Sequence, residues 1–112
     1  MSLANYQAYF YEMTKTRSTM YDNGSIKIVC EKLAFDGSIH GMVVIINAAI
    51  QEKIICHAYF GVLNGDCRVE TPECVITCAF QQGLLHGEYR QTYKATGFTS
   101  TRQFVCGHEI LN

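Results

Sequence analysis

A short phrase framed by two glycines, Gly-x-(Ile/Leu)-(His/Asn)-Gly, occurs three times in the chain. The copies span residues 37–41, 61–65 and 83–87, so their closing glycines are 24 and then 22 residues apart. Repetition at this spacing is typical of modular arrays, in which each unit packs on its neighbours. An array presents an extended surface, whereas an enzyme needs side chains that converge on one point. The repeats therefore predict the architecture and leave the partner open.

Turn signals separate runs of β-branched and aromatic residues along the chain. Asn23-Gly24 and Asp36-Gly37 are the strongest of them, because both central residues of a type I′ hairpin turn need positive φ. Apolar and polar residues alternate over residues 26–30 and 88–93, and no segment keeps a sustained helical apolar period. The sequence therefore predicts an all-β fold, an antiparallel β-meander of about eight or nine strands.

The chain of 112 residues is close to the commonest domain size, so we expect a single domain. Residues 1–19 are expected to form an N-terminal cap region, in which the aromatic residues between positions 5 and 12 favour a strand over a short helix. Residues 20–112 are expected to form the repeat region.

Charge and hydropathy exclude several classes of protein. The net charge of −1 comes from scattered residues, so no nucleic-acid partner is predicted. The N-terminus lacks a basic segment followed by an apolar core, and the longest apolar run, residues 42–50, is too short to span a bilayer. We therefore expect an intracellular, cytoplasmic protein without a signal peptide or transmembrane segment.

The middle of the chain is apolar on both faces of its predicted strands. Residues 43–46 and 54–60 do not alternate with polar residues. A single-layer sheet with water on both sides would not tolerate this pattern. Either the sheet curls over itself, or another subunit or partner covers its second face. A symmetric copy of the chain is the simplest cover, so we expect a homodimer.

Residues 21–27 and 35–41, and again 83–89, 93–98 and 104–108, closely resemble the MORN repeat, especially its variant form. The middle unit is degenerate, since Asn64 replaces the histidine. The resemblance covers about residues 20 to 110. It implies a ribbon of antiparallel hairpins used in protein–protein contacts, in dimerisation and, in some members, at membranes. It supplies no catalytic residues. Membrane contact is not favoured here, because basic residues are few and scattered.

The repeated glycines and histidines are predicted to support the turns. Glycine provides positive φ and a close backbone approach. His40 and His86 occupy the same place in their repeats, and Asn64 takes that place in the third, which favours a ring bonded to a backbone carbonyl over a metal ligand. The predicted turn residues are Gly24, Gly37, His40, Gly41, Gly61, Gly65, Gly83, His86 and Gly87.

The six cysteines are expected to be buried, reduced thiols rather than disulfides or zinc ligands. Cys56 and His57 are adjacent on a predicted strand and so point to opposite faces, which argues against a thiol enzyme, although His108 is an alternative base. No other catalytic motif is present. We therefore predict no enzymatic activity, no cofactor and no metal site.

Aromatic residues in the last repeat are the candidate partner-binding residues, because the opposite face of that repeat is polar. These residues are Tyr89, Tyr93, Phe98 and Phe104. The predicted function is a non-catalytic protein–protein interaction or assembly module, a scaffold that self-associates. A peripheral lipid-binding module and a purely structural oligomerisation protein are the open alternatives.

Overall fold

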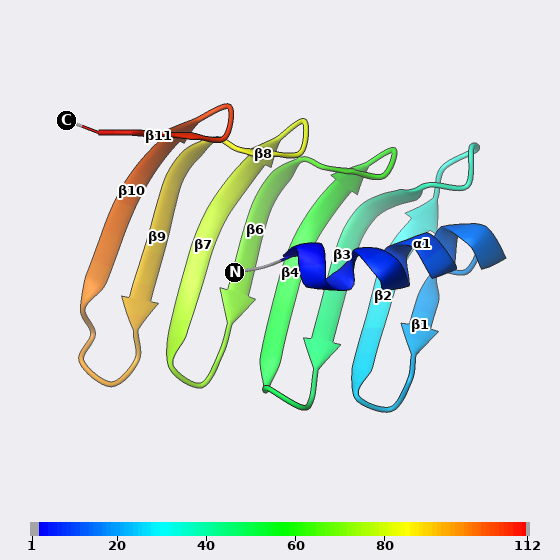
Figure 1. Cartoon of the computed structure of the whole chain (residues 1–112), viewed down its shortest axis with the longest axis horizontal. Coiled ribbons are helices and arrows are strands. Elements are labelled where there is room, and N and C mark those ends of the chain that lie inside the picture. The colour runs from blue at the N-terminus through cyan, green and yellow to red at the C-terminus, as the bar shows by residue number, and fades with distance from the viewer. Residues whose placement is uncertain (1–2, 112) are drawn as a thin grey trace.

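The protein is one open antiparallel sheet with a helix lying across one of its faces (Figure 1). The structure is a computed structural model that describes residues 3–111, apart from the side chain of Ala4. The strand order follows the chain, β1-β2-β3-β4-β6-β7-β9-β10-β11, so neighbours in sequence are neighbours in space. The predicted all-β, antiparallel architecture is confirmed.

The sheet has eleven strands, more than the predicted eight or nine. They are β1 (Met20–Asp22), β2 (Ile26–Leu33), β3 (Ile39–Asn47), β4 (Glu52–Tyr59), β5 (Val62–Leu63), β6 (Gly65–Glu70), β7 (Cys74–Gln81), β8 (Leu84–Leu85), β9 (Gly87–Tyr93), β10 (Thr99–Val105) and β11 (His108–Ile110). The two-residue strands β5 and β8 pair with the ends of β4 and β7. Positive φ at Gly65 (98°) and Gly87 (92°) separates each from the strand that follows. Without the two short strands β5 and β8 the sheet has nine strands, which is the upper predicted number.

The N-terminal segment is helical, so the preference for a strand at residues 5–12 is wrong. A 3₁₀-helix η1 (Leu3–Tyr6) leads into the α-helix α1 (Gln7–Thr16). Tyr6, Phe10 and Met13 recur at helical spacing, and Tyr6 and Met13 are buried at 2% and 1% exposure. Aromatic content favoured a strand, but this spacing decides the structure. No helix among the described residues is long and apolar enough to cross a membrane.

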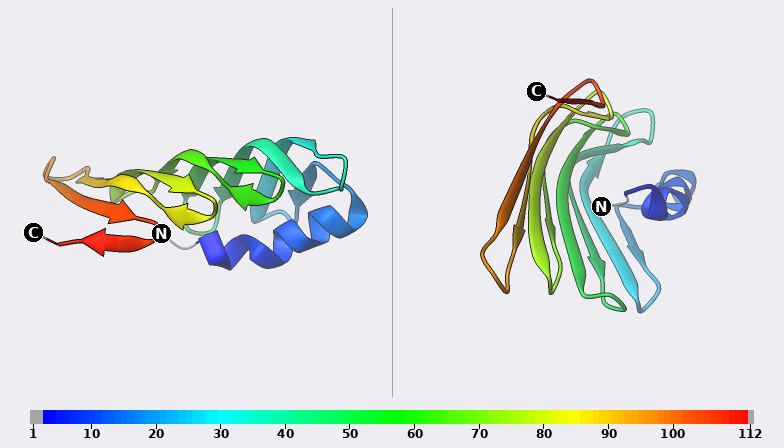
Figure 2. Two further views of the ribbon diagram at one scale, coloured as in Figure 1. Left: turned by 90° about the horizontal axis from the view of Figure 1, so that it is seen from above. Right: turned by 60° about the vertical axis from the view of Figure 1, so that its left-hand side comes forward.

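The helix α1 covers the inner face of the first four strands, on the concave side of the sheet (Figure 2). The Tyr6 hydroxyl donates to Glu52 Oε1 at 2.7 Å and accepts from Asn47 Nδ2 at 3.3 Å, which ties the helix to the β3–β4 hairpin. Burial, and then the bond to Glu52, raises the pKa of Tyr6. The second layer over this face therefore comes from the chain itself, while the outer face stays open.

Candidate interaction surface

The turns at one edge of the sheet are stacked by backbone hydrogen bonds that repeat along the chain. In each case a turn glycine donates to a carbonyl of the preceding repeat: Gly61 to Ile39 at 2.8 Å, Gly83 to Leu63 at 2.8 Å, and Gly107 to Leu85 at 2.7 Å. Each turn therefore depends on its neighbour, as in other arrays whose repeats contact only adjacent repeats. We call this series the turn ladder.

A side chain in the repeated His/Asn position adds a second bond to each step of the turn ladder. His40 Nδ1 accepts from the Phe60 backbone N–H at 3.1 Å, and His86 Nδ1 accepts from Cys106 N–H at 3.3 Å. Asn64 Oδ1 accepts from Gln82 N–H at 3.4 Å. These side chains were expected to bond to a backbone carbonyl, but each accepts a hydrogen bond from a backbone N–H instead. Histidine and asparagine can both occupy the position because each offers an acceptor atom there.

The seven predicted turn glycines all have positive φ, between 81° and 98°. At Gly83 a Cβ would lie 3.3 Å from Val62 Cγ1, so the side chain of one turn packs on the glycine of the next. Gly41 is the tightest position, since a Cβ there would lie 2.5 Å from Glu31 Oε1. That carboxylate accepts the Met42 backbone N–H at 3.0 Å. These glycines therefore allow close packing between repeats.

The four predicted partner-binding aromatics lie on the inner face of the β9–β10 hairpin, beyond the end of α1. They form two pairs rather than one row. Tyr89 and Phe104 meet edge to face at 5.9 Å between ring centroids, and Tyr93 and Phe98 lie 6.3 Å apart. Phe104 is only 8% exposed, whereas Phe98 is 63% and Tyr93 40% exposed. Tyr93 and Phe98 are therefore available for contact, and Phe104 supports Tyr89.

Arg102 and Glu109 complete this hairpin surface, and neither was predicted from the sequence. The Arg102 guanidinium lies over the rings of Tyr89 and Phe104, at 5.7 and 5.2 Å from their centroids. Its Nε donates to Glu109 Oε1 at 2.9 Å, and this bonding lowers the pKa of Glu109 and raises that of Arg102. The Cys106-Gly107 turn was the available signal, because it sets Phe104 opposite Glu109.

An apolar groove of about 670 Å³ runs between α1 and the short strands β5 and β8. Its lining includes Phe10 from the helix and Leu63, Phe80 and Leu85 from the sheet. The groove has a volume typical of sites that hold ligands or peptide side chains. Leu85 lies in the strand directly before β9, so the groove ends next to the hairpin surface.

Three cysteines lie side by side on the inner face, an arrangement that was not predicted from the sequence. The Cys67 thiol is hydrogen-bonded to the thiols of Cys56 and Cys78. The bond with Cys56 raises the pKa of Cys67 to about 12 and lowers that of Cys56, and the bond with Cys67 raises the pKa of Cys78. Cys30 and Cys74 are also buried, whereas Cys106 is exposed. The regular eleven-residue spacing of 56, 67 and 78 was the available signal.

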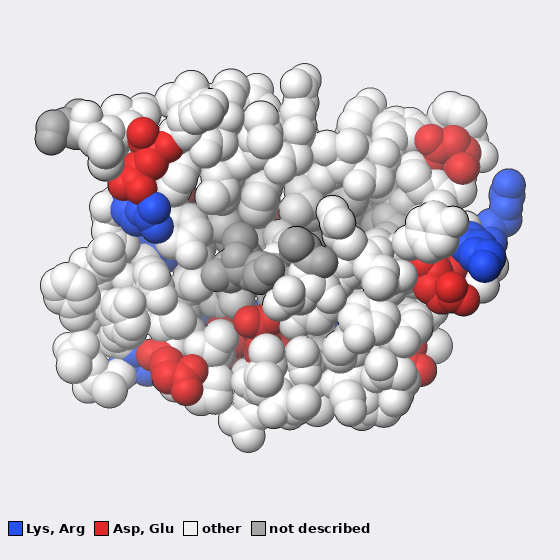
Figure 3. All heavy atoms as spheres, viewed as in Figure 1, with Lys and Arg blue, Asp and Glu red and all other residues white. Residues whose placement is uncertain are grey.

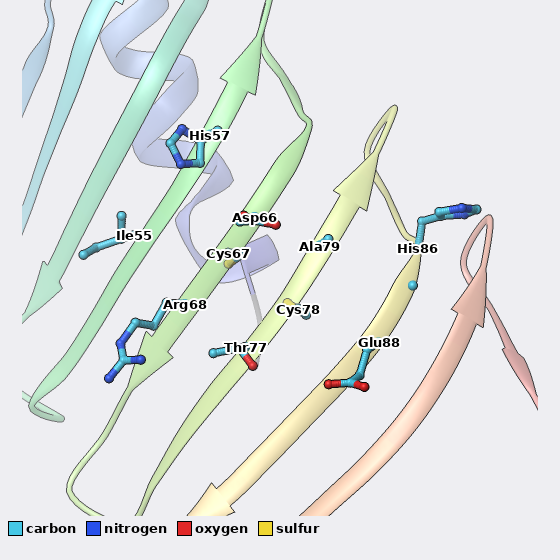
Figure 4. Close-up of a pocket in the computed structure, with 11 residues that line it drawn as sticks. Ile55, His57, Asp66, Cys67, Arg68, Thr77, Cys78, Ala79, His86 and Glu88 are labelled. Atoms are coloured by element: carbon cyan, nitrogen blue, oxygen red, sulfur yellow. The ribbon is translucent and has the colours of Figure 1, made fainter.

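The outer face carries a shallow polar hollow of about 470 Å³ (Figure 4). His57, Asp66, Arg68 and Glu88 surround it, and the small Ala79 lies between them. The hollow carries charges of both signs. The opposite face, which carries α1, likewise has scattered charges of both signs (Figure 3). Among the described residues no group of three or more His, Cys, Asp or Glu side chains is arranged to hold a metal ion.

No protein-family model matches the chain, and no curated protein matches it as a relative. The MORN-like assignment therefore stays a prediction from the repeats.

Proposed function

We propose that the protein is a non-catalytic interaction and assembly module of MORN-like repeats, which binds a segment of a protein partner and also self-associates. The partner's segment lies in the groove beside α1 and continues across the inner face of the β9–β10 hairpin. The repeats supply a rigid support, and no chemical step is involved.

The observation that carries this proposal is the incomplete cover of the inner face. The helix covers the first four strands and stops; the apolar groove runs beside it as far as β8, and the exposed pair Tyr93 and Phe98 lies farther on, at the end of the β9–β10 hairpin remote from Leu85. Exposed aromatic residues and apolar grooves are both typical of protein interfaces. Arg102, held by Glu109, offers a charged group for the partner's acidic or carbonyl oxygens.

The turn ladder supports the MORN-like part of the proposal. Each step repeats the same backbone bond and the same His/Asn bond, so the hairpins stand in line as structural repeats. A surface carried by such repeats is held in place without a large core, which suits a module that presents side chains to a partner.

Affinity capture from the native source, with the full chain as bait, tests the proposed surface. We expect the wild-type chain to retain a partner that the double variant Tyr93→Ala/Phe98→Ala loses. Phe35→Ala is the matched control, because Phe35 is 90% exposed and lies in the turn between β2 and β3, away from this surface. Equal capture by the wild-type chain and the double variant, or no capture by either, would overturn the assignment.

A further inference from the structure

The outer face of the first four strands carries a continuous apolar patch. Its central row crosses the strands through paired positions, from Met20 to Val29, Val44 and Ile55. Met42 and Ile46 flank Val44 on the same face of β3, at 46% and 43% exposure. The helix lies on the opposite face, so nothing among the described residues covers this side (Figure 2). We call these six residues the outer patch.

The apolar core of the outer patch is smaller than the area that one partner buries in a standard interface. Three strand spacings of about 4.8 Å and four residue steps of about 3.3 Å give roughly 14 by 13 Å before side chains are added. That backbone area, roughly 190 Å², is below the few hundred Å² at which exposed apolar patches mark interaction sites, so the charges beside the patch are needed to identify its partner. The strands that form the patch include residues 43–46 and 54–60, whose apolar residues on both faces led us to expect a partner over the second face.

Charges of opposite sign stand at the two ends of the row beside the outer patch. That row runs from Asp22 through Lys27 and Ile46 to Lys53. Asp22 and Lys53 are exposed, and neither makes an ion pair within residues 3–111. One oxygen of Asp22 accepts the Gly24 backbone N–H at 2.9 Å, which fixes the carboxylate at the edge of the patch.

This arrangement is complementary to itself under one particular symmetry. A two-fold axis parallel to the strands, between β2 and β3, sets β1 against β4 and β2 against β3 of the other copy. Met20 then faces the partner's Ile55, Val29 faces the partner's Val44, and Asp22 faces the partner's Lys53, each contact occurring twice. An axis across the strands would instead set Arg68 against the partner's Arg68, which like-charge repulsion disfavours.

We propose that a second copy of the chain covers the outer patch, through a face-to-face two-fold contact closed at both ends by Asp22 and the partner's Lys53. This inference rests on the self-association in the proposed function and names its surface. The apolar patch is small for a specific interface, so we expect a weak dimer whose population depends on the protein concentration. The groove and the β9–β10 hairpin stay free on the opposite face for the other partner.

Sedimentation velocity over a micromolar concentration series, with the full chain, measures this contact. We expect the wild-type chain to dimerise, and Asp22→Lys or Lys53→Asp alone to weaken dimerisation about tenfold through lost and repelling pairs. An equimolar mixture of the two variants restores the wild-type affinity, because both pairs are attractive in the mixed dimer. Asp66→Lys is the matched control: it reverses an exposed charge on the same face outside the patch and keeps the wild-type affinity.

Three outcomes overturn the inference: a wild-type chain that stays monomeric throughout, variants that dimerise like the wild type, or a mixture no tighter than its components. A monomeric chain that floats with liposomes of anionic lipid would assign the patch to a membrane and overturn it too. The two proposals fail separately. The Tyr93→Ala/Phe98→Ala variant leaves dimerisation intact, and loss of dimerisation leaves partner capture by the hairpin surface intact.

Discussion

His40 Nδ1 accepts the backbone N–H of Phe60 across 3.1 Å, from one repeat to the turn of the next. The same bond recurs from His86 to Cys106 and, with an amide in place of the ring, from Asn64 to Gln82. The His/Asn position is therefore an acceptor that satisfies a turn amide. This relationship explains why the two residue types exchange in the sequence, and it couples each hairpin to the one after it.

Replacement of His40 separates the acceptor from the rest of the ring. We expect His40→Asn to keep most of the stability and His40→Leu to lose about 0.5–1.5 kcal/mol, because leucine leaves the Phe60 amide without this acceptor. Urea unfolding at constant pH gives both values. His57→Leu is the control, since His57 is exposed and makes no such bond. Equal stability of the Asn and Leu variants would show that the bond contributes nothing.

Two glycines with nearly the same φ allow strain and contact to be separated. Gly24 (91°) and Gly41 (92°) both favour glycine, but a Cβ at Gly24 meets nothing within 4 Å, whereas at Gly41 it meets Glu31. We expect Gly24→Ala to cost about 1–2 kcal/mol from backbone strain and Gly41→Ala to cost at least about 1 kcal/mol more. Adding Glu31→Ala to Gly41→Ala recovers part of that excess, because it removes the contacts with Oε1 and Cδ but keeps the Glu31 Cβ, 2.9 Å away. Thermal and urea unfolding provide the measurement, and equal losses at the two glycines would refute the contact.

The row of thiols predicts a loss of stability at high pH. The bond with Cys56 raises the pKa of Cys67 to about 12 in the folded chain, above its ordinary value of 9.0. A raised acid pKa means that the folded state keeps a proton that the unfolded state gives up. The contribution of the protonated Cys67 thiol to the free energy of unfolding is therefore complete below pH 9. It falls as the pH rises toward 12, by at most about 1.4 kcal/mol per pH unit for one group.

Unfolding free energies from pH 8 to 11 in wild-type and Cys67→Ala chains measure this effect. The variant has a smaller fall with pH than the wild type, whatever its stability at neutral pH. Cys106→Ser is the control, since Cys106 is exposed and lies outside the row, and it keeps the wild-type slope. A Cys67→Ala slope equal to that of the wild type would contradict the hydrogen-bonded row.

The positions of the turns were readable in the sequence, but the type I′ geometry expected at Asn23-Gly24 and Asp36-Gly37 is wrong, since only the glycine of each pair has positive φ. Both residues have positive φ instead at Phe60-Gly61, Gln82-Gly83 and Cys106-Gly107. Asn23-Gly24 and the three glycine-framed phrases predicted hairpins in chain order, and the sheet runs in that order. The breaks at Gly65 and Gly87 were not predicted, because a glycine that interrupts a strand and one that ends it look alike in the sequence.

The helix and much of the site depend on spacing and register. The apolar residues Tyr6, Phe10 and Met13, spaced four and then three apart, span too few turns to outweigh the β preference of aromatics, and only packing on the sheet decides the structure. Arg102, Glu109 and the thiol row come together through strand register, which the sequence fixes only once every turn is placed. The outer patch was anticipated as two-faced strands, but its end charges required the register.

The turn ladder is the feature on which the rest of the account depends, and amide hydrogen exchange by NMR tests it most directly. The Gly61, Gly83 and Gly107 amides lie in turns at the edge of the sheet, yet each donates to the preceding repeat. We predict slow exchange at all three, in contrast to Gly24, whose amide bonds only to the exposed Asp22 side chain. Exchange of the three amides as fast as that of Gly24 would contradict the stacked repeats.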